Sequence, residues 1–302
     1  MDVSTPSRPK STNSAVAAET VRPLHAMSVD VEDWFQVWAL SSVISREDWD
    51  DHALRVEDST SRLLDLFAAK GAGCTFFILG WVAERLPGLI RRMAEEGHEI
   101  ASHGWDHTKV FDQTPDEFRE DIRKTKACLE DIAQVTVTGF RAAGFSIDSR
   151  TPWAHEILAE EGHLYSSSSH PIAHDHYGDP DAPLGVHVAG GALVEIPVAV
   201  QEIFGRRQSC AGGGWFRAMP YPVSRSLWRR LEGAGRQGVF YFHPWEVDPD
   251  QPKVGGLSLK SRLRHRLNLP VMERKVGRLL DDFRWGRIDQ VFAEDIARGA
   301  TL

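Results

Sequence analysis

Residues 74–107 read CTFFILGWVAERLPGLIRRMAEEGHEIASHGWDH and predict a strand, a helix and a second strand in succession. Residues 74–79 are a run of β-branched and aromatic residues, which is typical of a buried strand. Residues 87–97 have a proline near their start and a glycine at their end, as a short helix does. Residues 98–102 are strand-like again and lead directly into two histidines. A strand, a helix and a strand in this order form a parallel β/α unit.

The same alternation extends outward from this unit in both directions. Further strands are predicted at residues 25–31, 137–143, 193–200 and 238–243, and further helices at residues 59–70, 115–133, 152–161, 223–232 and 271–283. No G-x-G-x-x-G follows the first strand, so the repeated units favour a barrel over a dinucleotide-binding sheet. Residues 166–191 are rich in Ser, His, Asp, Pro and Gly and predict an irregular segment. We expect one domain over residues 24–298, preceded by a disordered polar tail at residues 1–23.

Composition excludes several classes of protein. The 302 residues carry 35 Lys and Arg against 43 Asp and Glu, so a nucleic-acid partner is not expected, although residues 262–266 form a local basic patch. Three cysteines without a CxxC pair argue against a disulfide framework and against a cysteine-based zinc site. The N-terminal residues lack the apolar core of a secretory signal, and no apolar run is long enough to span a bilayer. We therefore expect a cytoplasmic protein without an integral membrane segment.

Reactive side chains follow several of the predicted strands. They are Asp30, Glu32, Asp33, His103, His107, Arg141 and His243. In parallel β/α folds the carboxyl ends of the strands meet at one rim, where active sites form. A single acid or a single H-x-x-x-H pair is more often a turn residue or a coincidence, but their convergence on one rim is harder to dismiss.

The chemistry of this set suits a mononuclear metal hydrolase. Two imidazoles and one carboxylate can bind Zn²⁺ or a similar divalent ion and leave open positions on it. Such an ion polarises a carbonyl and lowers the pKa of water, while a second carboxylate accepts the water's proton. Asp30 and Glu32 are two residues apart, so an extended strand points both to the same side. Arg141 would keep Asp30 ionised and oriented.

Four segments resemble the motifs of a known family. SVDVEDWF (28–35), residues 75–107, FRAAGFSI (140–147) and FYFHPWE (240–246) are similar, in this order, to polysaccharide deacetylases of the NodB-homology type, carbohydrate esterase family 4. Together with GGGWFR-x-x-PY (212–221), they resemble the subfamily encoded beside exosortase and exopolysaccharide systems. The resemblance covers residues 25–295. It implies a distorted (β/α)7 barrel that removes N-acetyl groups from the amino sugars of a polysaccharide or its precursor.

The resemblance also implies roles by matching position. Asp30 would be the general base, Arg141 would orient it, and His243 would be the general acid. The catalytic ion would be one divalent metal, with Zn²⁺ preferred and Co²⁺ or Ni²⁺ as alternatives. The sugar, its linkage, the chain length and the oligomeric state are left open.

The ligands of that metal would be Glu32, His103 and His107. Asp33 remains an alternative to Glu32, because a local bulge would present it instead. Three tryptophans close to these motifs would bind the substrate by stacking on sugar rings, with simple packing as the alternative; they are Trp34, Trp105 and Trp245.

Two departures from the family pattern bear on activity. The family usually carries a proline soon after the arginine, whereas here Arg141 is followed by Ala-Ala-Gly at 142–144. The glycine would loosen a turn whose backbone N–H is expected to help hold the oxyanion. Relatives usually have an aspartate that pairs with the arginine where this chain has Ser166, so either Asp148 or Asp175 compensates or the arginine is held less firmly.

These departures keep two rival functions open. One is hydrolysis of another C–N bond, such as that of a cyclic amide, on the same fold. The other is a catalytically silent homologue that only binds carbohydrate. An open groove lined by tryptophan would favour a sugar polymer, and a small closed pocket would favour the cyclic amide.

Overall fold

The structure, a computed structural model, describes residues 22–174 and 178–299. Residues 1–21 of the predicted tail (1–23), and Asp175, lie outside the described residues. The described strands are β1 (Leu24–Val31), β2 (Thr75–Ile78), β3 (Glu99–Ser102), β4 (Gly139–Phe140), β5 (Tyr165–Ser166), β6 (His187–Val188), β7 (Val194–Glu195), β8 (Val200–Ile203), β9 (Arg206–Ser209), β10 (Val239–Phe242) and β11 (Arg284–Gly286).

The main sheet is a curled, largely parallel sheet. Its strands follow the order β10-β1-β2-β3-β4-β5-β7-β6, and β11 pairs with the start of β1. All neighbours from β10 to β7 are parallel. Just beyond β7, Val198 forms a parallel bridge to Val239 in β10, so the path returns toward its beginning. The predicted α/β fold, a distorted (β/α)7 barrel in a single domain, is confirmed in this curled form.

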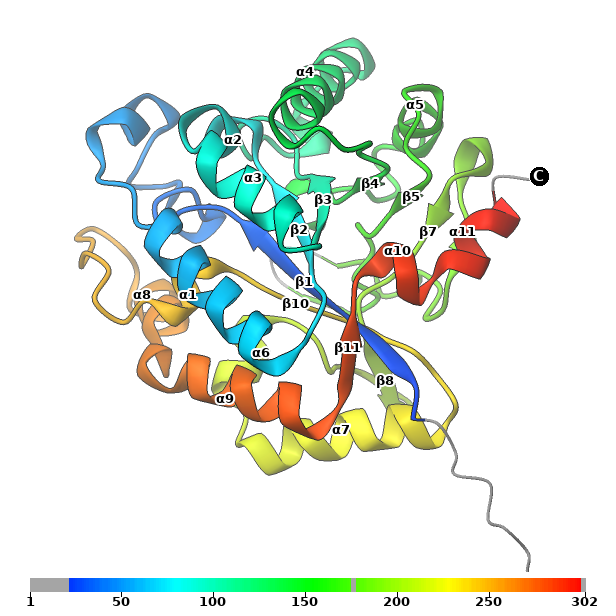
Figure 1. Cartoon of the computed structure of the whole chain (residues 1–302). Coiled ribbons are helices and arrows are strands. Elements are labelled where there is room, and N and C mark those ends of the chain that lie inside the picture. Colours follow the sequence, from blue (N-terminus) through cyan, green and yellow to red (C-terminus); the bar gives the residue numbers. More distant parts are fainter. Residues whose placement is uncertain (1–21, 175–177, 300–302) are drawn as a thin grey trace, which may run out of the picture.

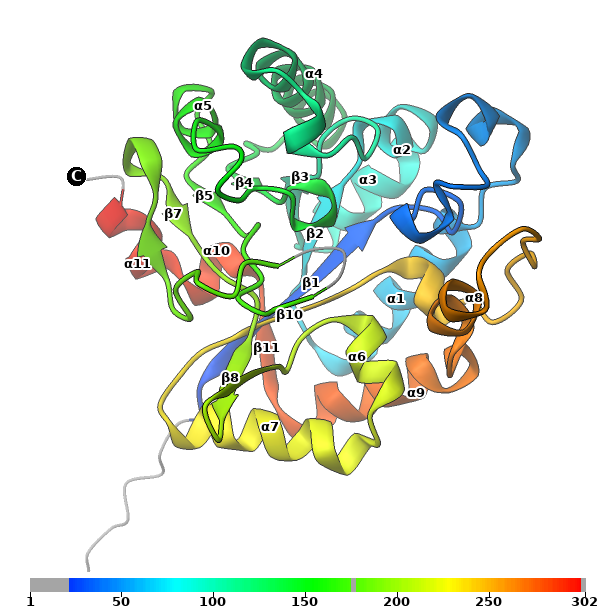
Figure 2. The same ribbon diagram turned by 180° about the vertical axis from the view of Figure 1, so that it is seen from behind.

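Helices cover the outside of this sheet (Figures 1 and 2). They are α1 (Val56–Lys70), α2 (Gly80–Arg85), α3 (Pro87–Glu95), α4 (Pro115–Ala133), α5 (Ala154–Glu160), α6 (Gly213–Ala218), α7 (Tyr221–Gly233), α8 (Leu259–Arg266), α9 (Leu269–Asp282), α10 (Ile288–Val291) and α11 (Ala293–Gly299). None of the described helices is both long and apolar enough to cross a membrane. All three cysteines are free.

Sequence signals placed most of the predicted elements to within a few residues, but short elements such as β9 and β11 were not predicted. The helix predicted at 115–133 is found with those bounds, and Thr114 caps it by accepting the backbone N–H of Glu117. The helix predicted at 59–70 begins three residues earlier, at Val56, because the Asp33 carboxylate accepts the backbone N–H groups of Arg55 and Val56. The strand predicted at 193–200 divides into β7 and β8, because β7 pairs with β5 whereas β8 pairs with β9.

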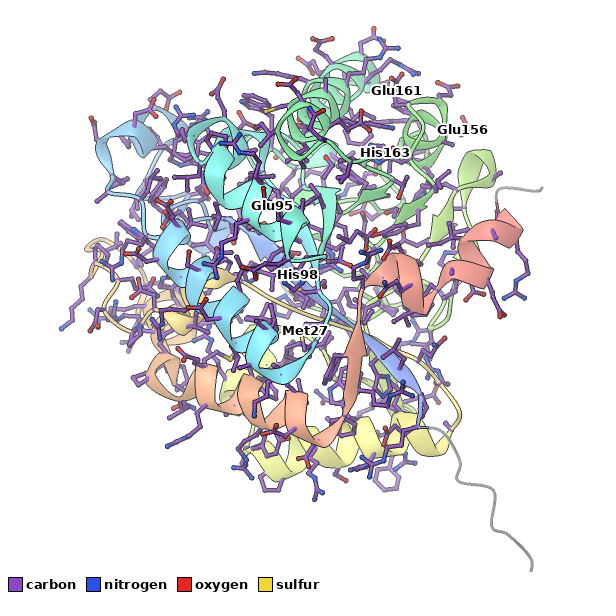
Figure 3. The ribbon with its side chains drawn as sticks, viewed as in Figure 1. Met27, Glu95, His98, Glu156, Glu161 and His163 are labelled. Atoms are coloured by element: carbon purple, nitrogen blue, oxygen red, sulfur yellow. The ribbon has the colours of Figure 1, made fainter. Side chains whose placement is uncertain are left out.

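Two histidines far from the predicted site are core residues. Figure 3 shows His98, just before β3, and His163, just before β5. Both are buried, and their rings pack edge-on against phenylalanines. Burial lowers the pKa of His98, and it lowers the pKa of His163 to about 3. These two histidines, at the amino ends of strands, are therefore uncharged core residues. The histidines beyond the carboxyl end of β3 lie instead beside carboxylates.

Candidate active site

The two acids at the end of β1 face the same group. Asp30 Oδ2 lies 3.9 Å and Glu32 Oε1 lies 3.6 Å from Nε2 of His243, and both carboxylates are buried. Asp33, the alternative ligand, points elsewhere: it accepts the backbone N–H groups of Trp34, Arg55 and Val56. The structure therefore presents Glu32, and not Asp33, to the rim.

Glu32 lies beside both histidines of the H-x-x-x-H pair. One ligand atom from each of Glu32, His103 and His107 can be chosen so that all lie within 4.8 Å of one another. The imidazole rings of His103 and His107 have centroids 5.4 Å apart. An ion that binds nitrogen and oxygen at about 2 Å can bridge ligand atoms at this spacing after small side-chain movements. The predicted metal ligands are thus brought together from the ends of β1 and β3.

The protonation of His103 suits a ligand. Its Nδ1 lies 2.8 Å from the backbone carbonyl oxygen of Arg141. Because a carbonyl oxygen only accepts, Nδ1 carries the hydrogen and Nε2 keeps its lone pair. Burial lowers the pKa of His103 to about 4, so the ring is neutral near pH 7.

The surroundings of the Glu32 carboxylate show whether a metal cation would fit beside it. Its Oε2 is buried and receives no hydrogen bond of normal geometry, although Nε2 of His107 is only 2.8 Å away. Burial would raise the pKa of Glu32, but His107 and His243 outweigh burial and lower it to about 2. A buried, ionised oxygen without a hydrogen bond is costly unless a positive charge compensates it. The donor set of two imidazoles and a carboxylate fits a divalent ion at this point.

The loop between the two histidines is held by Asp121 of α4. Its Oδ1 accepts the backbone N–H of Trp105 at 2.6 Å, and its Oδ2 would lie 3.3 Å from a Cβ at Gly104, where φ is +76°. His107 itself has φ of +61°, a left-handed conformation that costs a non-glycine residue energy. The strain is retained at the residue whose ring faces Glu32, which is where functional sites keep such conformations.

Asp30 is oriented by a buried arginine. Nη1 of Arg141 donates to Asp30 Oδ1 at 2.6 Å and to the Ser28 hydroxyl at 2.9 Å. Nε and Nη2 of Arg141 donate to the carbonyl and the hydroxyl of Ser167, both at 2.9 Å. The guanidinium is fully buried, so these partners fix it in place. The expected Asp30–Arg141 pair is present.

The two departures from the family pattern do not loosen this pair. Ser167 takes the place of the missing aspartate, beside Ser166, whose hydroxyl bonds to Ser168 instead. Asp148 does not compensate, because its carboxylate accepts bonds from Arg150. Gly144 adopts φ of +59°, a conformation that glycine reaches without strain, so the residue suits a defined turn and does not loosen it.

His243 is held from its other side by Glu246. Glu246 Oε2 accepts the backbone N–H of His243 at 3.0 Å and lies 3.1 Å from its Nδ1. Glu246 Oε1 accepts a hydrogen bond from Nε of Arg217 at 2.8 Å, and both side chains of this ion pair are buried. Burial alone would lower the pKa of His243, but Glu32 and Glu246 outweigh burial and raise it to about 9. His243 therefore carries a proton near neutral pH, with Nε2 toward the two acids of β1.

A glycine makes room for this support. A Cβ on Gly213 would lie 1.8 Å from Oε2 of Glu246, which no side chain can tolerate. At the adjacent Gly214 a Cβ would meet nothing within 4 Å. The GGGWFR motif thus places a glycine and Arg217 around one carboxylate. Arg217 and Glu246 were not among the predicted site residues. Each is a charged residue inside one of the two motifs at residues 212–221 and 240–246, and that was the pattern that could have identified them.

The three predicted sugar-binding tryptophans lie in different surroundings. Trp245 stacks on His243 with centroids 5.3 Å apart, and its Nε1 donates to Glu32 Oε1 at 3.2 Å. Trp34 is buried against Phe35. The Trp105 ring packs on Gly80, with Nζ of Lys124 3.3 Å from the ring centroid. Only Trp245 contacts the residues of the site directly.

A pocket opens beside His107. It has a volume of about 180 Å³, and its lining includes Trp38, Arg46, Trp49 and Asp106. Trp38 and Trp49 were not among the predicted substrate-binding residues, because both lie in the segment between β1 and α1, away from any strand end. Trp49 is buried with the Arg46 guanidinium 4.4 Å from its ring centroid, and Nζ of Lys109 lies 3.4 Å from the ring centroid of Trp38.

Two family models match different parts of the chain. Residues 48–162 match the model described as polysaccharide deacetylase, which includes His103, His107 and Arg141. Residues 167–293 match a model described as a domain of unknown function, DUF3473, which includes Arg217, His243 and Glu246.

Curated relatives match in short segments. A peptidoglycan-N-acetylglucosamine deacetylase of Bacillus cereus is 33% identical over 98 residues, which are 32% of this chain and 36% of that protein. A chitooligosaccharide deacetylase of a Bradyrhizobium species is 27% identical over 100 residues, which are 33% of this chain and 43% of that protein. The chain therefore spans less than half the length of these relatives.

Among solved structures, a candidate polysaccharide deacetylase from Mycobacterium smegmatis has a TM-score of 0.62 at 23% identity, over 99% of this chain and 96% of that one. At this identity the likeness shows the fold. The polysaccharide deacetylase model and these relatives thus match parts of the chain, and the solved structure shares its fold.

Proposed function

We propose that this chain belongs to the polysaccharide deacetylase family and hydrolyses the N-acetyl groups of amino sugars in a polysaccharide or its precursor. The observation that carries the proposal is the convergence of Glu32, His103 and His107 beside Asp30 and His243. The matching relatives are deacetylases of peptidoglycan and of chitooligosaccharide, which supports an N-acetylglucosamine-type substrate.

Glu32, His103 and His107 would hold the divalent ion. Zn²⁺ suits two imidazoles and a carboxylate, and Co²⁺ or Ni²⁺ can take the same ligands. A bound ion supplies Lewis-acid stabilisation of the negative charge that develops on the acetyl oxygen.

Asp30 is the proposed general base. Arg141 binds its Oδ1, so Oδ2, on the side of His243, is the oxygen that accepts the proton of the attacking water. Four hydrogen bonds fix the guanidinium, so the carboxylate is oriented before substrate arrives. Orientation of this kind lowers the entropic cost of the reaction.

His243 is the proposed general acid. Nδ1 is occupied by Glu246, so Nε2 is the nitrogen that faces the reaction. An amine is a poor leaving group unless its nitrogen gains a proton, and His243 is protonated near neutral pH because its pKa is raised to about 9 by the surrounding carboxylates, against the effect of burial. Its Nε2 can therefore give a proton to the departing amine nitrogen.

The setting that we propose is exopolysaccharide biosynthesis. Its support is the resemblance of GGGWFR-x-x-PY and FYFHPWE to the subfamily encoded beside such systems. The firm anchoring of Arg141 removes one argument for a silent homologue.

The test is acetate release from N-acetylglucosamine oligomers, combined with elemental analysis of the purified full chain. We expect a divalent metal in the protein, loss of acetate release after chelation, and recovery on adding Zn²⁺, Co²⁺ or Ni²⁺. Acetate release that persists in metal-free protein would contradict the metal site. If no acetate is released with any of the three ions, the silent homologue or the cyclic-amide hydrolase is favoured. An assay with a cyclic amide, run in parallel, separates these two, because only the hydrolase would cleave it.

A further inference from the structure

Residues 252–268, which include α8, form a surface that the proposed chemistry does not use. We call it the α8 surface. It contains a pocket of about 710 Å³ whose lining combines apolar side chains with Lys253, Arg262 and Arg266; the apolar ones are Val254, Leu257, Leu259, Leu263 and Leu267. The pocket is much larger than the one beside His107.

Two leucines of α8 are turned toward solvent. Leu259 is 71% exposed and Leu263 is 62% exposed. Being four residues apart on a helix, they lie on one face and form a continuous apolar stripe. Exposed leucines at single positions are common, but a pair on one face beside an apolar pocket indicates a contact surface.

The α8 surface is also strongly basic. Residues 251–272 contain five Lys and Arg and no Asp or Glu, in a chain whose formal net charge is −8. Lys253, Lys260 and Arg262 are exposed. The acids that flank this stretch along the chain are Asp250, which is exposed, and Glu273, which pairs with Arg62. Between these two acids, every Lys, Arg, Asp or Glu of the chain is a lysine or an arginine.

The opposite face of α8 is anchored to the active site. His265 is buried, lies 2.6 Å from Gln251 through Nε2, and stacks on Trp245 with centroids 4.6 Å apart. Trp245 in turn stacks on His243. Figure 1 shows α8 near the ends of β1 and β10, the rim from which the proposed base and acid come. The orientation of the leucine stripe is thus fixed relative to the site.

We propose that the α8 surface docks on an anionic lipid bilayer, with Leu259 and Leu263 entering the interface and the surrounding cations facing lipid phosphates. The two exposed leucines match the apolar interior of a bilayer, and each cation near an anionic leaflet strengthens binding. A nucleic acid would use the cations but leave the leucines in water, which is why a bilayer is favoured. This inference rests on the proposed function: docking would direct the active site toward N-acetylated glycans attached to lipid.

The test is sedimentation of the full chain with phosphatidylcholine vesicles, with or without phosphatidylglycerol. We expect binding only to the anionic vesicles, weakened by added salt. L259Q/L263Q and, separately, K253E/R262E should each lower the partition coefficient by about tenfold or more. The matched control is Phe204→Gln, which removes a fully exposed apolar side chain from the β8–β9 hairpin and should bind like the unmodified chain.

Each outcome decides the inference. The inference is overturned if the unmodified chain does not bind anionic vesicles, or if F204Q and L259Q/L263Q lose vesicle binding equally. It is also overturned if the chain retains a DNA duplex but does not bind vesicles. Acetate release from water-soluble oligomers, measured on the same preparations, should be unchanged in L259Q/L263Q. Vesicle binding without acetate release would contradict the proposed function alone, and acetate release without vesicle binding would contradict the docking alone.

Discussion

The two halves of the described chain contribute different kinds of group to the site. The half that ends at residue 162 supplies the candidate metal ligands and the base with its arginine; they are Glu32, His103, His107, Asp30 and Arg141. The half from residue 163 supplies the proton donor and its support; they are His243, Glu246 and Arg217. In the proposed mechanism the first half would hold the ion, and the second would deliver the proton.

The difference lies in how each group is held. The metal ligands are placed by β1 and β3, which are separated only by β2 in the sheet, and His103 is fixed by the backbone of Arg141. His243 depends instead on a buried ion pair between Glu246 and Arg217, which come from two separate segments. Ion binding and proton delivery should therefore be separable by mutation.

The largest effect is expected from His103→Ala. The variant loses a buried imidazole whose Nε2 is available to the ion, so metal content should fall to background in elemental analysis. Acetate release should fall by more than about 10³-fold, beyond the 10- to 100-fold typical of outer-shell changes. His187→Ala, at a histidine in β6, is the control and should keep both metal and activity. Unchanged metal content in His103→Ala would break the proposed division of roles.

His243→Ala should separate the two halves. The metal should stay bound, because none of the proposed ligands is altered. Turnover should fall by about 10²- to 10⁴-fold, the range expected for loss of a proton donor. Steady-state acetate release and metal analysis on one preparation measure both quantities. Loss of metal together with activity would make His243 part of the metal site.

Gly213→Ala tests the support of His243. A Cβ at this position would lie 1.8 Å from Glu246 Oε2, so the carboxylate must move away from His243. We expect turnover to fall by about tenfold or more, with metal retained. Gly214→Ala is the matched control, because a Cβ there meets nothing within 4 Å. Equal activity of the two variants would show that the position of Glu246 does not matter.

The smallest effect concerns a second contact between the halves, at the amino ends of the strands. Burial, and then the charge of Asp289, raise the pKa of Glu99 to about 7. Glu99 accepts hydrogen bonds from Thr75, Tyr165 and the backbone of Asp289. Because the folded-state pKa lies above the unfolded value, the folded state binds the extra proton between about pH 4.5 and pH 7.

Stability should therefore fall as the pH rises through that window and level off above it. The loss from this group is on the order of 3 kcal/mol. Urea unfolding from pH 5 to pH 8 should show that the stability of Glu99→Gln, relative to the unmodified chain, increases across the window. Parallel stability profiles for the two proteins would contradict the raised pKa of Glu99.

Local sequence patterns were sufficient for much of the architecture. The amphipathic spacing of residues 115–133 placed α4, and the apolar runs of β2 and β10 placed those strands to within one or two residues. Such signals are local because capping and amphipathic periodicity act within a few residues. The same patterns placed acids and histidines at strand ends, which was enough to name the candidate ligands and the proton-transfer residues.

Other features depend on contacts between distant segments. Asp33 was an open alternative to Glu32 until the fold showed that it caps α1. Ser167 replaces an expected aspartate at Arg141, and Arg217 supports a histidine 26 positions away through Glu246. The sequence by itself determined which chemical groups stand at the ends of the strands. Only the tertiary structure decided which of them face one another, because partners such as Asp30 and Arg141, or Arg217 and Glu246, come from segments far apart in the chain.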